Sequence, residues 1–183
     1  MVNRIKSALL GLVTLWLAAC STTIQSSASY EKLDKQAKWV LLPIANNTST
    51  PQAALSAEAM VDHLLRHNGI TSLVSYPSAL SRDTLFEPTE RKVSDEAQKW
   101  AREQGAQFAV TGSVEEWRYK VGIDGEPAVG VTLKVIDLSN SRVVWSASGA
   151  KSGWSRQALS AVAQALLTDL LKTLQTAPVK AGT

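Results

Sequence analysis

A run of strict alternation in the C-terminal half constrains the fold of this 183-residue chain most strongly. From Val129 to Val135 every second residue is valine or leucine, and glycine, threonine and lysine stand between them. This period of two is typical of a β-strand with one buried face. A polar turn at 137–142 separates it from an apolar run at 143–145, and the preceding segment 107–121 alternates as well. We therefore predict an antiparallel meander of three strands.

The first of these segments, 107–121, changes its pattern in the middle. Its apolar residues keep one parity over 108–114 and the other parity over 117–121. A switch of this kind, near Glu115 and Glu116, predicts a β-bulge, in which one extra residue shifts the register.

The last segment with a helical pattern is rich in alanine and leucine. We expect a helix at 156–175, with Ser155 as its N-cap. Its apolar residues cover more than one face, which indicates burial on several sides. Two interpretations stay open: the helix lies across its own sheet, or it contacts another subunit.

The chain before the meander alternates between strand and helix patterns. Residues 39–44 are a continuous apolar run, typical of a strand covered on both faces, and 70–76 are a second strand. A helix is expected at 51–67, with Pro51 in the first helical position, and another helix follows a cap at Ser94. Together with the meander, these elements predict an α/β fold: a mixed sheet of about five strands with three helices.

The first 19 residues have the pattern of an export signal. Arg4 and Lys6 precede an uncharged run, 8–19, that is too short to span a bilayer, since a membrane helix needs about 20 residues. The run ends at Cys20, the single cysteine of the chain, which excludes an internal disulfide. The Leu-Ala-Ala-Cys stretch that ends at Cys20 resembles the lipobox of bacterial lipoproteins. The resemblance implies cleavage before Cys20 and acyl chains, such as palmitate, on this residue.

This pattern divides the chain into four parts. We expect a signal peptide at 1–19, a lipidated flexible tether at 20–38, a single α/β domain at 39–176 and a frayed tail at 177–183. Serine rather than aspartate follows the cysteine. In lipoproteins this implies the periplasmic face of a Gram-negative outer membrane, and several acyl chains make the attachment firm.

The charge of the chain argues against nucleic acid as a partner. The chain has 19 basic and 16 acidic residues, and two of the basic ones belong to the signal. The mature protein is therefore nearly neutral, without the clustered basic face that nucleic-acid binding needs.

No catalytic or metal-binding pattern stands out. His63 and His67 are four residues apart, the spacing of two metal ligands on a helix, but no glutamate follows the first and Arg66 precedes the second. The segment 149–153 lacks the spacing of a phosphate-binding loop, and no Gly-x-Ser-x-Gly motif is present. We expect a non-enzyme with no metal and no cofactor apart from the lipid on Cys20.

Three segments resemble a group of small periplasmic α/β lipoproteins. They are VTLKVIDLSNSRVVWSASG at 131–149, WVLLPIANNTSTPQAALSAEAMVDHLL at 39–65 and AQFAVTG at 106–112. The group includes the curli-secretion channel protein, the activator lipoproteins of penicillin-binding proteins, and the PelC family of Pel exopolysaccharide export. Size, short tether and strand order are closest to the PelC family, over nearly all of 39–175.

The other members of this group fit less well on physical grounds. A curli-type membrane barrel would turn charged side chains of the segment 107–121 toward lipid, which is expensive; these are Glu115, Glu116, Arg118 and Lys120. A synthase activator needs a long linker to cross the cell-wall layer, whereas 18 tether residues reach at most ~60 Å.

The PelC resemblance implies a ring-forming subunit, a dodecamer, on the inner leaflet of the outer membrane. The subunit ring would guide a cationic exopolysaccharide of the biofilm to a β-barrel porin partner. The alternative is a periplasmic regulatory lipoprotein that activates a cell-wall synthase.

Aromatic and acidic residues are expected on two opposite faces of such a ring. Trp154 is the first candidate for membrane contact, because its neighbours are small and polar and indoles favour membrane interfaces; burial at the end of the core is the alternative. Trp117 and Tyr119 follow, although core packing is the stronger interpretation for both. Trp39, Trp100 and Trp145 are expected in the core. The carboxylates expected to attract the polymer are Asp124, Glu126, Glu115 and Glu116; the alternative is that they are ordinary solvated charges of a loop. Arg118 is expected to pair with a carboxylate, either across a subunit boundary or within the subunit.

Overall fold

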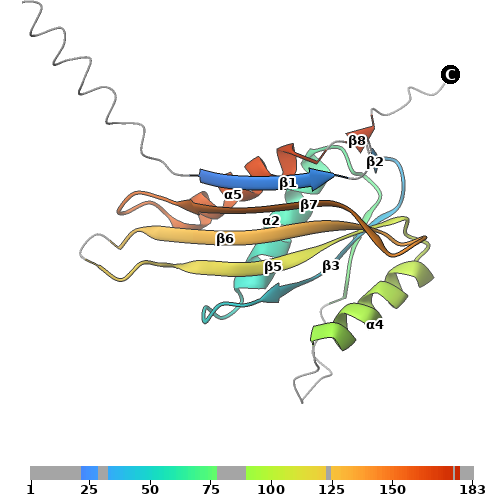
Figure 1. Ribbon diagram of the computed structural model, residues 1–183, viewed down its shortest axis with the longest axis horizontal. Coiled ribbons are helices and arrows are strands. Elements are labelled where there is room, and N and C mark those ends of the chain that lie inside the picture. Colours follow the sequence, from blue (N-terminus) through green and yellow to red (C-terminus); the bar gives the residue numbers. More distant parts are fainter. Residues whose placement is uncertain (1–21, 29–32, 78–89, 123–124, 175, 178–183) are drawn as a thin grey trace, which may run out of the picture.

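The computed structural model describes residues 22–28, 33–77, 90–122, 125–174 and 176–177. Within them, six strands form one sheet (Figure 1), in the order β1 (Thr22–Ala28), β7 (Arg142–Ser152), β6 (Pro127–Asp137), β5 (Phe108–Tyr119), β3 (Trp39–Asn46) and β4 (Leu73–Ser75). The helices are α2 (Ala53–His67), α4 (Glu90–Glu103) and α5 (Leu159–Lys172). A separate two-stranded sheet joins β2 (Leu33–Asp34) and β8 (Thr176–Ala177).

The pairing of the strands confirms the α/β class and the meander. β5, β6 and β7 pair antiparallel in sequence order, whereas β3 lies parallel to both of its neighbours, β4 and β5. The sheet is therefore mixed, as predicted. It has six strands instead of about five because β1 extends the edge next to β7.

The predicted bulge lies in β5. Val114 pairs with Val131 and Glu116 pairs with Gly130, so Glu115 is the extra residue. The bulge reverses which side chains face the core beyond this point.

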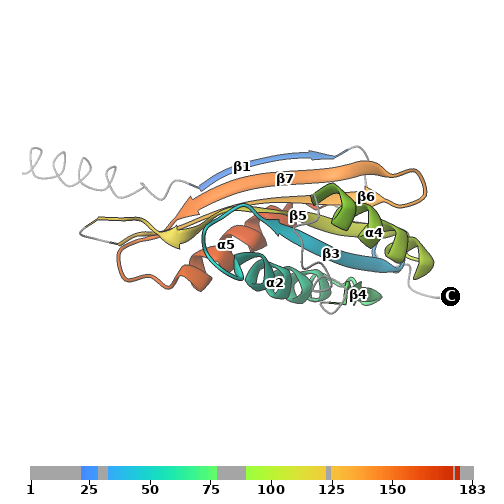
Figure 2. The same cartoon turned by 90° about the horizontal axis from the view of Figure 1, so that it is seen from below.

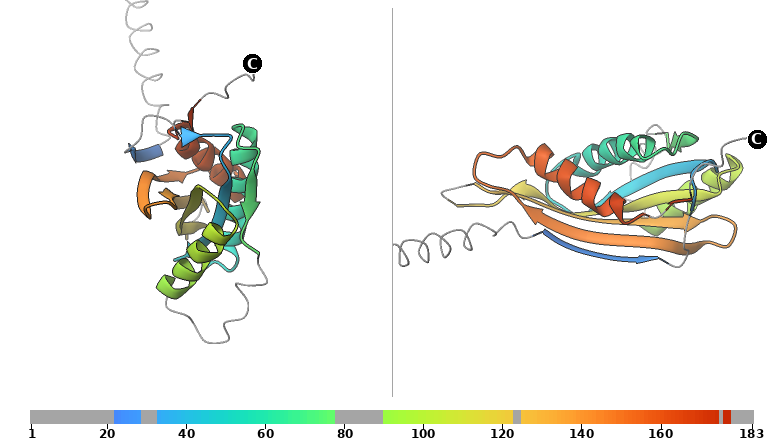
Figure 3. Two further views of the ribbon diagram at one scale, coloured as in Figure 1. Left: turned by 90° about the vertical axis from the view of Figure 1, so that its right-hand side faces the viewer. Right: turned by 90° about the horizontal axis from the view of Figure 1, so that it is seen from above.

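Helices cover both faces of the sheet, but unequally (Figure 2 and Figure 3). The larger core lies between the sheet and the helices α2 and α5, and includes the fully buried Trp39 and Trp145. A smaller core lies between the other face and α4, around Val40 and Ala101. Trp100 is only half-buried there, with its aromatic ring 5.1 Å from that of Tyr76, centroid to centroid.

Helix α5 lies across its own sheet, which was the first of the two interpretations. It packs on β6 and β7 and buries Val162, Ala163, Leu166, Leu167, Leu170 and Leu171. None of the described helices is long and apolar enough to cross a bilayer.

The predicted helix starts were wrong by several residues. Helix α5 begins at Leu159, after Arg156 in the left-handed region at φ 70°, so Ser155 is not its cap. Helix α2 begins at Ala53, after Gln52 at φ 61°, so Pro51 lies outside it. Helix α4 begins at Glu90 and includes Ser94. The sequence did not predict these starts, because residues other than glycine are uncommon in the left-handed region and their type does not reveal it.

The flexible tether expected at 20–38 is corrected by the structure. All seven residues of β1 pair with β7, from Thr22 opposite Lys151 to Ala28 opposite Trp145, and β2 adds a short second pairing. The polar composition of β1 is that of an exposed edge strand, which needs only one side chain on the core; that side chain is Ile24. At the other terminus Ala177 pairs in β8, while the rest of the expected frayed tail lies outside the described residues.

Candidate functional site

One end of the large sheet gathers most of the residues that the sequence singled out. We call it the anchor end: the start of β1, the tip of the β5–β6 hairpin, and the chain between β7 and α5 (Figure 1). One backbone hydrogen bond joins the chain after β7 to the start of β6, and a second one closes the β5–β6 hairpin. The N–H of Gly153 donates to the carbonyl of Pro127 at 2.8 Å, and the N–H of Lys120 donates to that of Glu126 at 2.7 Å.

The predicted lipidation site adjoins this end. Cys20 itself lies outside the described residues, but it is two residues from Thr22, which pairs with Lys151 in β7. Two residues of extended chain span at most ~7 Å. A lipid on Cys20 would therefore bind the membrane directly beside the anchor end.

Large apolar side chains are exposed at the anchor end. Trp154 is 63% exposed and Tyr119 is 50% exposed. Tyr119 also has a local structural role, because its hydroxyl accepts a hydrogen bond from the N–H of Leu159 at 3.0 Å and donates one to the carbonyl of Gln157 at 3.3 Å. Val121, which the sequence analysis did not select, is fully exposed at the hairpin. The only sequence feature that marks Val121 is that it is an apolar residue beside a turn.

Trp117 is corrected from a membrane candidate to a core residue. It is 6% exposed and packs in the larger core. The bulge at Glu115 is the physical reason, because the extra residue returns Trp117 to the face that holds Val114. The strand pattern had already favoured packing for this residue.

Two of the four proposed carboxylates lie together at the bulge. Glu115 is exposed and accepts hydrogen bonds from the Ser113 hydroxyl at 2.5 Å and from the Asn47 amide at 3.0 Å. These donors, Ser113 first and then Asn47, lower the pKa of Glu115 below its usual value. Glu115 therefore stays ionised over the neutral range.

The neighbouring carboxylate is used within the chain. The guanidinium of Arg118 donates to Glu116 at 3.0 Å, two residues apart on one strand. Of the two possibilities for Arg118, the described residues contain the pairing inside the subunit. Both side chains are solvent-accessible, so the pair contributes little to stability.

The two remaining carboxylates belong to the hairpin tip. Glu126 is half-buried beside Pro127, and Asp124 lies outside the described residues. Glu126 is thus at the same end of the sheet as Trp154, since the chain segments around them are hydrogen-bonded through Gly153. The placement of aromatic and acidic residues on opposite faces of a ring stays a prediction.

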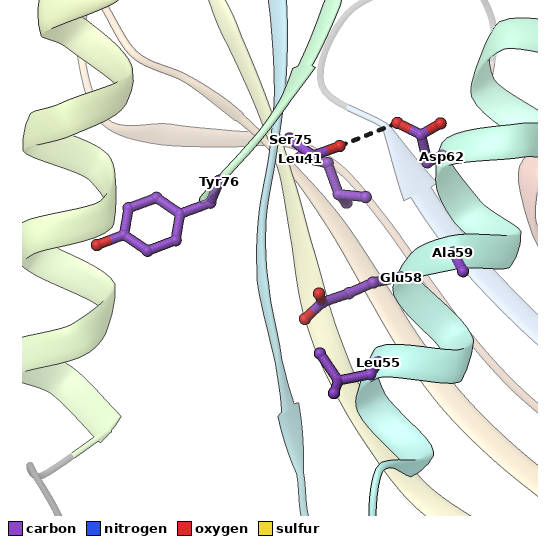
Figure 4. A pocket seen from close by; sticks show the side chains of 7 residues that line it. All are labelled: Leu41, Leu55, Glu58, Ala59, Asp62, Ser75 and Tyr76. Atoms are coloured by element: carbon purple, nitrogen blue, oxygen red, sulfur yellow. Dashed lines mark hydrogen bonds between the residues drawn. The ribbon is translucent and has the colours of Figure 1, made fainter. Parts of the chain in front are cut away.

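A separate pocket of about 440 Å³ lies between α2 and the edge of the sheet at β3 and β4 (Figure 4). Its lining contains none of the predicted site residues: Leu41, Leu55, Glu58, Ala59, Asp62, Ser75 and Tyr76.

The carboxyl of Glu58 points into this pocket and accepts a hydrogen bond from the N–H of Ile44 at 2.8 Å (Figure 4). Burial raises the pKa of Glu58, an effect that the Ile44 hydrogen bond partly offsets. Sequence reasoning missed this residue because an isolated glutamate on a helix resembles any solvated charge.

Asp62, one helical turn further on, has its partners within the chain. Arg66 donates to it at 2.8 Å and the Ser75 hydroxyl at 2.9 Å, and the Arg66 hydrogen bond is the main cause of its lowered pKa. These contacts tie α2 to the edge strand β4.

The histidine pair is a solvated helix face. His63 and His67 are both exposed, with ring centroids 6.3 Å apart. The described part of the chain contains no group of three or more side chains able to hold a metal ion.

Comparison with solved structures gives close similarity to one kind of protein. A PelC dodecamer from Paraburkholderia phytofirmans is 40% identical, with a TM-score of 0.73, over 86% of this chain and all of that one. A second PelC dodecamer structure from the same organism is 41% identical over the same shares, also at 0.73. The lipoprotein GNA1162 from Neisseria meningitidis shares the fold at 17% identity, with a TM-score of 0.54, over 74% of this chain and 96% of that one.

Two further comparisons found nothing. No family model matches the sequence, and no curated protein matches it. The 40% identity to PelC, which this chain covers over its whole length, is decisive by itself. The chain belongs to the PelC family.

Proposed function

We propose that this protein is a ring-forming lipoprotein of the outer membrane that guides a cationic exopolysaccharide to a β-barrel porin during export. The observation that carries the proposal is the 40% identity to PelC dodecamers over all of their chain. A closed ring forms when two different surfaces of one protomer meet repeatedly and the rotation between protomers closes.

The geometry of the anchor end supports a lipid-anchored protein. The acyl chains on Cys20 would enter the periplasmic face of the membrane within two residues of β1. Trp154, exposed beside that point, has the amphipathic side chain that membrane interfaces favour.

Carboxylates near the same end would act on the polymer. Glu115 is ionised and exposed, and Glu126 lies close to the hairpin tip. Twelve copies would place many such charges around one opening, close to the membrane where a porin begins. Charges within a Debye length of about 8 Å act together on a cationic chain at physiological salt.

The alternative, a regulator of a cell-wall synthase, needs a long linker to cross the cell-wall layer. The pairing of β1 leaves only residues 20 and 21 between the lipid and the sheet, a span of at most ~7 Å. This is far less than the ~60 Å that the 18 residues of the expected tether could span, so the short connection favours a protein that acts at the membrane.

Charge reversal tests the polymer-guiding role. We expect the double substitution Asp124→Lys and Glu126→Lys to reduce exported polysaccharide while protein level and membrane localisation stay normal. Glu103→Lys, at an exposed position of α4, is the matched control and should export normally. Normal export by the double variant would contradict the acidic guiding role.

A further inference from the structure

We propose that the pocket between α2, β3 and β4 binds a small protonated amine, with the ammonium group at the carboxylate of Glu58 and the carbon body of the ligand against Leu41 and Leu55. The ligand class is a primary ammonium ion on a short alkyl chain or on a single sugar ring. The site does not depend on the proposed export role.

The pocket opens where the edge strand β4 ends. β4 pairs with only the first three residues of β3, from Trp39 opposite Leu73 to Leu41 opposite Ser75. The N–H of Tyr76 still donates to the carbonyl of Leu41 at 2.8 Å, but the described chain provides no strand partner for the outer edge of β3 beyond this point. Helix α2 lies beside this gap, and the pocket between them has a volume of about 440 Å³, within the range of sites that hold one small molecule.

Glu58 is fixed in this pocket by one of its two carboxylate oxygens. Ile44 lies beyond the end of β4, after a register shift in the pairing of β3 with β5. Its N–H donates to Oε1 of Glu58 at 2.8 Å. The other oxygen, Oε2, has no hydrogen-bond or ion-pair partner in the part of the chain that the structure describes. One oxygen is therefore positioned by the fold, and the other can accept a hydrogen bond from a ligand.

The charge of Glu58 has no opposite charge beside it, in contrast to that of Asp62. Arg66 donates to Oδ2 of Asp62 at 2.8 Å and to Oδ1 at 3.1 Å, and the Ser75 hydroxyl donates to Oδ1 at 2.9 Å. The residues that line the pocket include no lysine, arginine or histidine. Burial raises the pKa of Glu58; the Ile44 N–H partly offsets this effect, and no basic side chain does. A bound ammonium group would supply the opposite charge together with charge-assisted hydrogen bonds.

The aliphatic part of the lining indicates what the ammonium group is attached to. Figure 4 shows the carboxyl of Glu58 between the side chains of Leu41 and Leu55. Leu55 is 51% exposed, so it presents a large apolar surface beside the carboxylate. Methylene groups of an alkyl chain, or the C–H face of a sugar ring, would bury this surface. An anion is disfavoured here because both charged groups of the lining, Glu58 and Asp62, are acidic.

Calorimetric titration of the full-length lipoprotein in detergent, at neutral pH and low salt, tests the site. The probes are n-butylammonium, glucosamine and N-acetylglucosamine, which has the sugar ring of glucosamine without its positive charge. We expect an amine to bind with millimolar affinity and N-acetylglucosamine not to bind. The amine with the higher affinity identifies the body that the pocket prefers, an alkyl chain or a sugar ring.

Two variants assign the binding to Glu58. Glu58→Gln keeps an oxygen for the N–H of Ile44 and removes the charge, so the affinity for the amine should fall at least about tenfold. Glu103→Gln removes an exposed carboxylate of α4 and should bind the amine as the parent protein does. Thermal unfolding checks that both variants are folded.

Three results would overturn the amine site. They are the absence of binding by either amine, equal affinity of N-acetylglucosamine and glucosamine, and equal affinity of the amine for the parent and for Glu58→Gln. The mass of the assembly and the export of polymer do not enter this test, so its failure is distinguishable from a failure of the proposed function.

Discussion

Gly112 lies in the middle of β5, where the added carbon of an alanine has no room. A Cβ at this position would overlap the carbonyl oxygen of Thr132 and lie 3.1 Å from the Cα of Leu133, which are backbone atoms of the paired strand β6. These atoms cannot rotate away, so the two strands must separate locally. Overpacking costs about 1–3 kcal/mol and at times more. Alanine offsets roughly 0.5–1 kcal/mol of this through backbone entropy.

The net expectation for Gly112→Ala is a loss of about 2 kcal/mol, from the upper part of the overpacking range. For a domain of this size, that corresponds to a Tm lower by roughly 4–8 °C. Urea unfolding followed by tryptophan fluorescence measures the free energy directly. Gly122→Ala, where no atom lies within 4 Å of the new Cβ, is the matched control. Two variants that agree within about 0.5 kcal/mol would refute the reasoning from close strand packing.

Three further predictions concern side chains with defined environments. Burial raises the pKa of the Glu58 carboxyl, so the unfolded chain ionises at a lower pH than the folded protein, and stability falls as pH rises through the folded pKa. Glu58→Gln should therefore raise Tm at pH 8 and not at pH 3.5; an equal effect at both pH values would contradict this. The Ser139 hydroxyl and N–H lower the pKa of Asp137, so its stabilisation is present above the unfolded pKa and lost in acid; Asp137→Asn should lower Tm at pH 7, with a difference that shrinks toward pH 2. Trp117→Ala should lower the free energy of unfolding by about 3–5 kcal/mol, whereas Trp154→Ala should change it by less than about 0.5 kcal/mol and weaken vesicle binding. Equal effects of the two substitutions on unfolding would contradict the burial of Trp117 and the exposure of Trp154.

Sequence periodicity predicted the elements whose side chains alternate or recur on a buried face. The meander and the bulge near Glu115 follow from the period of two and its interruption, and both are present. The position of Trp117 shows the limit of this reasoning. The pattern favoured core packing for this residue but left membrane contact open, and the burial of its side chain decides for the core.

The elements that sequence reasoning missed depend on partners far away in the chain. β1 is polar because it is an edge strand, and its single core contact requires Gly149, more than a hundred residues later. The pocket carboxyl of Glu58 is another such case, since its burial depends on the way α2 lies on β3 and β4. Neither arrangement can be predicted from the local composition.

In the candidate site, too, features of local sequence were predictable and contacts between distant segments were not. Exposure of Trp154 was one of two interpretations of its small polar neighbours, and its side chain is exposed. The joining of Trp154 and Glu126 at one end was not predicted, because it depends on the hydrogen bond between Gly153 and Pro127.

The mass of the lipid-free domain in solution tests the central claim most directly. The domain, purified without the signal and without a tag, is measured by light scattering over a range of concentrations. A closed assembly of about twelve protomers is the expected result, as in the PelC dodecamers that it resembles. A protomer mass at every concentration would contradict a ring-forming exporter subunit.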